Sequence, residues 1–400
     1  MEKLVMNRRI IQHFLLLLFL CLMNYEGVRG TKILNKPPMK TIKTEYGDVY
    51  DCVDFYDQPA FHHPLLKNHN YHPQMKPSLL TKESIPTASR SATTLQPMGL
   101  SDGGCPVGTV PIRRYTKEDV IRQKLLPPPE DTVHVVDPPL TNRDNFNDSK
   151  TRRIKPLKGY KLAIVSTDDN PNNKFGGASM IAAIYNPRST GQQHSACRLK
   201  LIKGKNIIQT GWRVDPTLYG DNRTRVFIHF HDGTNSCFDL LCPSFVIVSQ
   251  NITLGQAFPN TSTIHGKLYD MAFQIKWDQE KGNWWLFLDN VAIGFWPKEV
   301  FDDFGNFATK VEWGGVVYSP AGVLEPPMGS GLYPLMRSTT VNAYCRVITL
   351  LNDKGLNIDL LGSKLPTFST TPMLYTVIDV PNYPGLDYNH TILYGGPGEI

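Results

Sequence analysis

The sequence lacks several features that are typical of common protein classes. It has no block of five or six like charges, and its net charge is only +6 over 400 residues, so nucleic acid is not an expected partner. No apolar run beyond residue 23 is long enough to span a bilayer. No repeat of fixed period occurs, and no convincing helical pattern follows residue 150. These absences argue against helical, repetitive and membrane-spanning folds.

Motifs of familiar catalytic and metal sites are also missing. No Gly-x-Ser-x-Gly elbow occurs, because Gly329-Ser-Gly331 has the wrong spacing, and this argues against a serine hydrolase. The pairs His62-His63 and His229-x-His231 stand without a His-Glu-x-x-His helix or two Cys-x-x-Cys motifs. We therefore expect neither a metal nor another cofactor.

The first 30 residues have the pattern of a secretory signal peptide. Lys3, Arg8 and Arg9 precede an apolar run from Ile10 to Met23, broken only by Gln12-His13. This run is shorter than the roughly 20 residues that a membrane anchor needs. We therefore expect residues 1–30 to be removed, the protein to be secreted, and no membrane association to remain afterwards.

Secretion would place the remaining cysteines in an oxidising compartment. Six thiols stay after the leader and its Cys21 are removed, and they allow fifteen pairings. Cys237 and Cys242 are five residues apart and can close a small loop by a disulfide. Sequons for N-glycosylation, which fit a secreted protein, lie at Asn147, Asn222, Asn251, Asn260 and Asn389.

Composition divides the mature chain into two units. All six tryptophans lie between Trp212 and Trp313. We expect a first unit over residues 31–126 that ends in a short helix, which a capping-box-like Thr116–Asp119 begins and Pro127-Pro-Pro129 stops. The polar, proline-containing residues 127–158 predict a linker that is open to proteolysis, and the second unit follows over residues 159–400.

Alternation with a period of two dominates the second unit. In residues 269–278 five apolar or aromatic side chains share one face, and Val226, Ile228 and Phe230 alternate in the same way. Further strands are predicted at 160–166, 179–185, 207–214, 245–249, 283–289, 291–296, 311–318, 344–350 and 374–380. Short strands separated by Gly, Pro and Asn predict an all-β, antiparallel sandwich.

Motifs along nearly the whole chain resemble the neprosin family of plant secreted proteins, whose founding member is a proline-specific glutamic endopeptidase. In the first unit, Cys52-Val-Asp54 and the segments 58–61, 63–68 and 104–109 look like the family's activation peptide. In the second unit the resemblance depends on the segments 211–212, 218–222, 237–246, 282–285, 313–315 and 328–331. The resemblance implies a removable activation peptide that can cover a groove, and a catalytic sandwich of two antiparallel sheets.

The family's chemistry is implied to need two glutamates, one to deprotonate a water and one to act as acid or oxyanion stabiliser. Their motifs, Glu-Ala-Gly-Trp and Trp-Gly-Gly-Glu, read here Gln209-Thr-Gly-Trp212 and Trp313-Gly-Gly-Val316. Gln209 cannot accept a proton near neutral pH, and Val316 has no titratable group. Since each acid–base group contributes about 10²- to 10⁴-fold, we expect a chain without the intact dyad to be inactive.

Features of a ligand groove nevertheless remain in the sequence. Gly211 shares a face with Gln209, and Gly314 shares a face with Val316, so that missing side chains would leave room for a ligand backbone. In the alternative, these glycines only mark bulges. Trp212 and Trp313 point to the opposite face, where we expect them in the core.

Two adjacent tryptophans, Trp284 and Trp285, must point to opposite sides of their strand. We expect one of them in the core and the other in the groove, stacked on proline rings or sugars.

The resemblance also bears on the disulfides. Members typically have a second Cys pair near the C-terminus, but only Cys345 is present here. Cys345 is therefore either unpaired or joined to Cys197. Cys52 with Cys105 is the pairing expected in the first unit.

The leading hypothesis is a secreted, catalytically inactive glutamic-peptidase-like protein that binds extended proline-containing peptides or cell-wall glycoproteins, in the apoplast or cell wall if the source is a plant. One alternative is an active prolyl endopeptidase that uses other carboxylates, such as Glu312 or Asp215. The other is a lectin-like sandwich that binds carbohydrate through Trp284 or Trp285.

Overall fold

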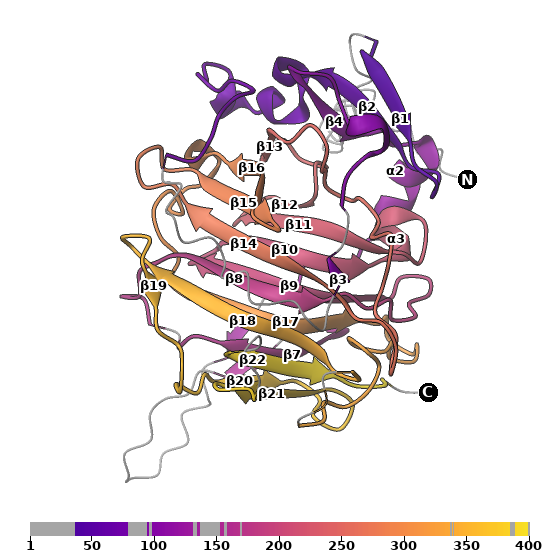
Figure 1. Cartoon of the computed structure of the whole chain (residues 1–400), viewed down its shortest axis with the longest axis vertical. Coiled ribbons are helices and arrows are strands. Elements are labelled where there is room, and N and C mark those ends of the chain that lie inside the picture. Colours follow the sequence, from indigo (N-terminus) through magenta and orange to yellow (C-terminus); the bar gives the residue numbers. More distant parts are fainter. Residues whose placement is uncertain are drawn as a thin grey trace, which may run out of the picture. The chain divides into compact units, whose positions relative to one another are not determined.

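In the computed structural model, the segments with alternating apolar and polar residues from residue 160 onward are strands of two large antiparallel sheets (Figure 1). The structure describes residues 37–78, 94–95, 98–130, 134–136, 153–155, 158–168, 170–336, 338, 340–384 and 389–398. The predicted signal peptide and the sequon at Asn147 lie outside these residues. No helix in the described part of the chain is long and apolar enough to cross a membrane.

The first large sheet has seven strands and carries both positions of the expected dyad. In spatial order its strands are β12 (Ser236–Phe238), β11 (Thr224–Asp232), β10 (Asn206–Val214), β9 (His194–Lys203), β17 (Lys310–Tyr318), β7 (Tyr160–Ser166) and β20 (Thr367–Ser369). The central strand β9 was not predicted, although Cys197, Leu199 and Leu201 alternate with Ala196, Arg198 and Lys200 along it.

The second large sheet has ten strands. Its main path runs β13 (Val246–Ile247), β16 (Val291–Trp296), β15 (Trp284–Leu288), β14 (Tyr269–Trp277), β8 (Phe175–Ala183), β18 (Ala343–Asn352), β22 (Thr391–Gly395) and β21 (Thr376–Val380). β19 (Asn357–Ile358) pairs with β18, and β3 (Thr94–Leu95) pairs with β14 in the parallel direction. Every strand predicted from period-two alternation lies in one of these two sheets, which confirms the all-β sandwich.

Two tryptophans connect the sheets through the core. The Trp212 indole N–H donates to the Ala183 carbonyl at 2.9 Å, and the Trp313 indole N–H donates to the Ser179 carbonyl at 3.1 Å. Both rings are fully buried, as predicted. Because each indole has a partner on β8, the large rings are buried without leaving an unsatisfied donor.

The first unit contains more regular structure than its sequence suggested. β1 (Lys40–Lys43), β2 (Val49–Asp54) and β4 (Thr109–Arg113) form a three-stranded sheet, and the Cys52–Cys105 disulfide links β2 to the segment before β4. Short 3₁₀ turns follow at η1 (Phe55–Asp57), η2 (Pro59–His62), η3 (Pro64–Leu66) and η4 (Ser101–Gly103), with η5 (Lys298–Val300) in the second unit. β5 (His134–Val136) and β6 (Arg153–Lys155) pair with each other.

The predicted helix is present as α2 (Lys117–Gln123). Thr116 accepts from the Asp119 N–H, and the Asp119 carboxylate accepts from the Thr116 N–H, which completes the capping box. α2 lies against α3 (Pro216–Tyr219): Arg122 donates to the Thr217 carbonyl, and Gln123 donates to the Leu218 carbonyl. Because α3 directly follows β10, the chain that leaves α2 begins near the C-terminal end of β10.

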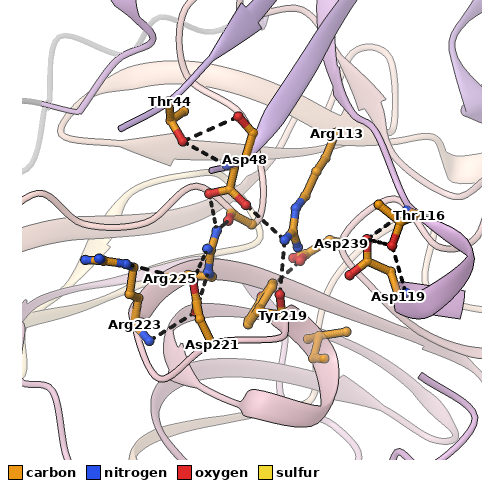
Figure 2. A network of polar contacts seen from close by, with 12 residues as sticks. Thr44, Asp48, Arg113, Thr116, Asp119, Tyr219, Asp221, Arg223, Arg225 and Asp239 are labelled. Atoms are coloured by element: carbon orange, nitrogen blue, oxygen red, sulfur yellow. Dashed lines mark hydrogen bonds and ion pairs between the residues drawn. The ribbon is translucent and has the colours of Figure 1, made fainter. Parts of the chain in front are cut away.

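A buried polar cluster joins β1, β2 and β4 to the sandwich, and we call it the Asp48 network (Figure 2). The Asp48 carboxylate accepts from Arg113 at 2.9 Å and from Arg225 at 2.7 Å. Arg225 also donates to the Gly255 carbonyl at 2.7 Å. Nearby, the Tyr219 hydroxyl donates to Asp239 at 2.9 Å. Residues 38–400 form one compact unit by their contacts, and this network is part of it.

Candidate functional site

The two positions of the expected dyad lie on the same face of the seven-stranded sheet. Residues paired across neighbouring strands point to the same side. Gln209 on β10 pairs with Lys200 on β9, and Lys200 pairs with Glu312 on β17. Val316 is four residues further along β17. We call this side, which is turned away from the Trp212 and Trp313 rings, the outer face.

The two positions have different surroundings. Gln209 is buried and its amide nitrogen lies 3.2 Å from Nδ1 of His229, whose Nε2 lies 2.8 Å from the Ser236 hydroxyl. Val316 belongs to an apolar cluster with Tyr160, Leu162, Ile164, Ala196 and Phe227. One position therefore remains polar, whereas the other has become part of an apolar surface that would disfavour a carboxylate.

Between these positions lies a cluster of charged side chains that was not predicted. The Glu312 carboxylate contacts Arg198 at 2.9 Å and Lys310 at 3.3 Å, and the three side chains are nearly inaccessible to solvent. Burial alone would raise the pKa of Glu312, but Lys200, Arg198 and Lys310 outweigh it and lower that pKa to about 2. Glu312 is therefore held as an anion: it has no proton to donate near neutral pH, and its low pKa makes it a weak base.

Asp215, the other alternative carboxylate, has a structural role. It is fully buried at the start of α3, where it accepts from the N–H groups of Thr217 and Leu218 at 3.0 Å. Its second oxygen contacts the Arg213 guanidinium at 2.7 Å. An N-cap that is also ion-paired has no oxygen left to activate a water.

A proline-rich stretch of the chain, Pro127–Glu130, lies against the outer face, and we call it the proline segment. The Tyr160 hydroxyl donates to the Pro128 carbonyl at 2.7 Å. The Glu130 carboxylate contacts Arg198 at 2.7 Å and Lys200 at 3.2 Å. Tyr160 pairs with Tyr318, two residues beyond Val316, so the segment passes the Val316 position between its two anchors. The sequence predicted these prolines only as a helix stop and the start of a linker.

The glycines expected in the groove flank Arg198. Gly211 on β10 and Gly314 on β17 both pair with Arg198, and neither pairing is interrupted by a bulge. Gly314 has a φ of +131°, and a Cβ there would press on the Ala163 carbonyl oxygen of β7. Glycine thus allows close strand pairing and leaves no side chain beside Arg198 on either neighbouring strand.

Trp284 and Trp285 are not part of this site, which corrects the expectation that one of them lines the groove. Both lie on β15 in the ten-stranded sheet and are fully buried. The Trp284 indole N–H donates to the Phe304 carbonyl at 2.6 Å. Trp285 packs on Phe295 and lines a small cavity with Pro77. Adjacent residues do point to opposite sides of a strand, but here both sides of the strand are covered.

The cysteines form two disulfides, Cys52–Cys105 and Cys237–Cys242, as expected. Cys197 and Cys345 are free thiols in the core, with their Sγ atoms 3.3 Å apart. Burial raises the pKa of Cys345 well above its ordinary value. Of the two possibilities left open for Cys345, the structure has the unpaired one.

Four predicted sequons lie in the described part of the chain, and all four asparagines are exposed: Asn222, Asn251, Asn260 and Asn389. The side-chain oxygen of Asn251 also accepts from the Leu100 N–H at 2.8 Å.

Two protein-family models match this chain, and several solved structures resemble it in part. A family model described as Neprosin matches residues 191–397, and a model described as Neprosin activation peptide matches residues 41–151. A structure of Scytalido-glutamic peptidase with a peptide-based transition state analog is 10% identical, with a TM-score of 0.31, and covers 60% of this chain and 97% of that chain.

Two further solved structures are similar. SCP-B, a member of the Eqolisin family of peptidases in a complex with the tripeptide Ala-Ile-His, is 9% identical, with a TM-score of 0.30, and covers 59% of this chain and 96% of that chain. CG-16, a homodimeric agglutinin from chicken liver, is 11% identical, with a TM-score of 0.22, and covers 39% of this chain and 92% of that chain.

Proposed function

The chain belongs to the neprosin family, and on that premise we propose that it is a secreted, peptidase-like protein that has lost hydrolytic activity and binds proline-containing peptides. The peptide lies on the outer face of the seven-stranded sheet. Peptide segments of secreted glycoproteins, including those of a cell wall if the source is a plant, are the natural ligands.

The loss of activity follows from the chemistry of the two dyad positions. Hydrolysis of an amide needs a group that removes a proton from water and a group that stabilises the oxyanion or protonates the leaving nitrogen. Gln209 can hydrogen-bond but cannot take up a proton, and Val316 can do neither. Glu312 stays ionised in its contacts with Arg198 and Lys310.

The binding role is supported by one observation above all: the proline segment of this chain lies on the outer face. Its backbone carbonyl at Pro128 is bound by a side chain, and its Glu130 carboxylate is bound by two more. A proline-rich peptide is extended and stiff before it binds, so it loses little conformational entropy on the surface. These contacts within the chain support the proposal that the outer face binds peptides of this class.

A cleavage assay tests the loss of activity. The purified protein is incubated with proline-containing peptides between pH 3 and pH 7, and no cleavage after proline is expected. Reproducible cleavage by independent preparations would show that other carboxylates serve, and it would overturn the proposal.

The matched experiment restores the two glutamates with Gln209→Glu and Val316→Glu. If the remaining geometry is that of a peptidase, the double variant gains cleavage at acidic pH. Because Val316 lies in an apolar cluster, circular dichroism must first show that the variant is folded. Val317→Glu, which places the charge on the core side of the same strand, is the control and restores nothing.

Carbohydrate binding is the competing role. Both tryptophans on which it was based are buried, so we expect no glycan-array signal that depends on Trp284 or Trp285.

Export itself is tested by expression with the native leader. The protein should reach the medium, and a glycosidase that removes N-glycans should increase its mobility on a gel.

A further inference from the structure

We infer that Arg198 and Lys200 form a subsite for a carboxylate side chain, so that the protein selects peptides in which glutamate or aspartate directly follows prolines. This inference rests on the proposed peptide-binding function and adds to it which residue the ligand must carry.

The subsite consists of two fixed charges on one strand. Arg198 and Lys200 are two residues apart on β9, and Lys310 lies beside them on β17. These side chains are almost completely buried, with 1% of Arg198 and 4% of Lys200 exposed. A buried cation is strongly unfavourable unless an anion lies against it. The site therefore needs negative charge.

Part of that charge comes from the sheet and part from outside it. Glu312 is a permanent member, because it lies on β17 between Lys310 and Arg198. Glu130 comes from the proline segment, which has no strand or helix to hold it, and its carboxylate contacts both Arg198 and Lys200. When this segment leaves, Arg198 and Lys200 lose the contacts with the Glu130 carboxylate, which the carboxylate of a peptide ligand can replace.

The position of the anchors defines the order of residues in the ligand. Tyr160 binds the Pro128 carbonyl, and the carboxylate site takes the side chain two residues later. The residues paired with Arg198 on both neighbouring strands are glycines, Gly211 and Gly314, so neither strand places a side chain directly beside it. A ligand with prolines followed by an acidic residue would repeat these contacts, whereas the same ligand with glutamine would lack the charge.

The test uses the full chain with its own segment weakened by Pro127→Gly, Pro128→Ser, Pro129→Gly and Glu130→Gln. Two peptides are compared by fluorescence polarisation: Leu-Leu-Pro-Pro-Pro-Glu-amide with an uncharged coumarin acylating its N-terminus, and the same labelled peptide with Gln in place of Glu. Both have neutral ends, so they differ in a single charge. We expect the Glu peptide to bind at least tenfold more tightly, and the unmodified protein to bind both more weakly.

Two variants in the weakened background localise the effect. Lys200→Met should remove most of the preference for the Glu peptide. Lys203→Met, on the same strand but in contact with Asp303 and Asn306 instead, should leave it intact. The preference should also disappear as the pH falls through the ordinary pKa of a glutamate, about 4.3.

The possible failures are distinguishable. Equal affinity for the two peptides would overturn the carboxylate subsite and leave the proposed peptide-binding function intact. A folded variant that binds neither peptide would overturn both. Binding of oligogalacturonate in place of the peptides would mean that the anion belongs to an acidic polysaccharide, and it would overturn the peptide assignment.

Discussion

Among the contacts between the first part of the chain and the sandwich are those of two carboxylates in different settings. Asp48 lies between β1 and β2 and is bound by Arg113 of its own sheet and by Arg225 of the sandwich. Glu130 lies on a stretch without a strand or helix and is bound only by side chains of the sandwich. If the Asp48 contact broke, charged side chains would be exposed both on the sheet of the first part and on the sandwich. If the Glu130 contact broke, the only folded surface with newly exposed charges would be the sandwich. We therefore expect the Asp48 contact to be permanent and the Glu130 contact to be exchangeable.

The largest effect on stability should follow from breaking the permanent contact at Asp48. Arg225→Met removes the partner of Asp48 and Asp221 and a donor to the Gly255 carbonyl, and it leaves Asp48 buried with less compensation. We expect a loss of about 3–5 kcal/mol in the free energy of unfolding, measured by urea denaturation at pH 7.

Arg223→Met is the matched control for this variant. Arg223 has a half-exposed side chain with a 3.9 Å contact to Asp221, so its loss should cost about 1 kcal/mol or less. Equal effects of the two substitutions would contradict the permanence of the Asp48 network.

The next effect concerns the pH response of the same network. Burial raises the pKa of Asp239 to about 6 from 3.8, although the Ile228 N–H and the Tyr219 hydroxyl act in the opposite direction. The folded state therefore binds this proton more tightly than the unfolded state. The resulting stabilisation is complete below about pH 4 and is lost as the pH rises through 6.

Asp239→Asn should abolish this pH dependence. Between pH 4 and pH 7 the wild-type protein should lose about 3 kcal/mol from this group, and the variant should not. Urea denaturation at the two pH values measures the difference. Asp102→Asn, at an exposed aspartate, should leave the wild-type slope unchanged; parallel curves for Asp239→Asn and the wild type would refute the assignment.

Loss of the exchangeable contact at Glu130 should loosen only the chain around it. Glu130→Gln removes the charge that contacts Arg198 and Lys200, and hydrogen bonds to charged groups contribute about 1.5–3 kcal/mol. Cleavage within residues 127–158 by a broad-specificity protease should therefore become roughly ten to one hundred times faster, while global unfolding changes less. Glu118→Gln, at an exposed position on α2, should not alter the rate. A uniform loss of stability would mean that the segment is a fixed part of the fold.

The smallest effect should come from the other anchor of the proline segment. Tyr160→Phe removes only the hydroxyl that donates to the Pro128 carbonyl and keeps the ring in the apolar cluster. We expect about 1 kcal/mol, or roughly fivefold faster cleavage of the same region. Tyr56→Phe, at an exposed tyrosine, is the control. An effect larger than that of Glu130→Gln would make Tyr160, and not the charge cluster, the main anchor.

Much of the sandwich could be predicted from the sequence. Strands with one apolar and one polar face, such as β14, were found because alternation is a local property. β9 was missed because Arg198 and Lys200 interrupt its apolar pattern, although their spacing of two is itself the sign of a strand with charges on one face. Gln209 and Val316 were marked by the family resemblance, and only the strand pairing of the structure places them on one face of a sheet.

The proline segment could not be found in this way. Its contacts join Glu130 to Lys200, 70 positions away, and only the folded chain brings them together. The burial of both Trp284 and Trp285 also depends on residues that are distant in the sequence. One of them is Tyr71, whose ring packs on Phe295 beside Trp285. Alternation along one strand cannot show what covers its second side.

The covalent link between the proline segment and the outer face has a quantitative consequence. A tethered ligand acts at an effective concentration that depends on the chain between it and its site and not on how dilute the protein is; short flexible tethers give values in the millimolar range. If the outer face binds peptides as proposed, a free peptide must outcompete a constant local concentration of Glu130. Cutting the chain on both sides of the segment would turn that constant into an ordinary dilution-dependent equilibrium, so two cleavages could change the apparent affinity by orders of magnitude without altering a contact in the sheet.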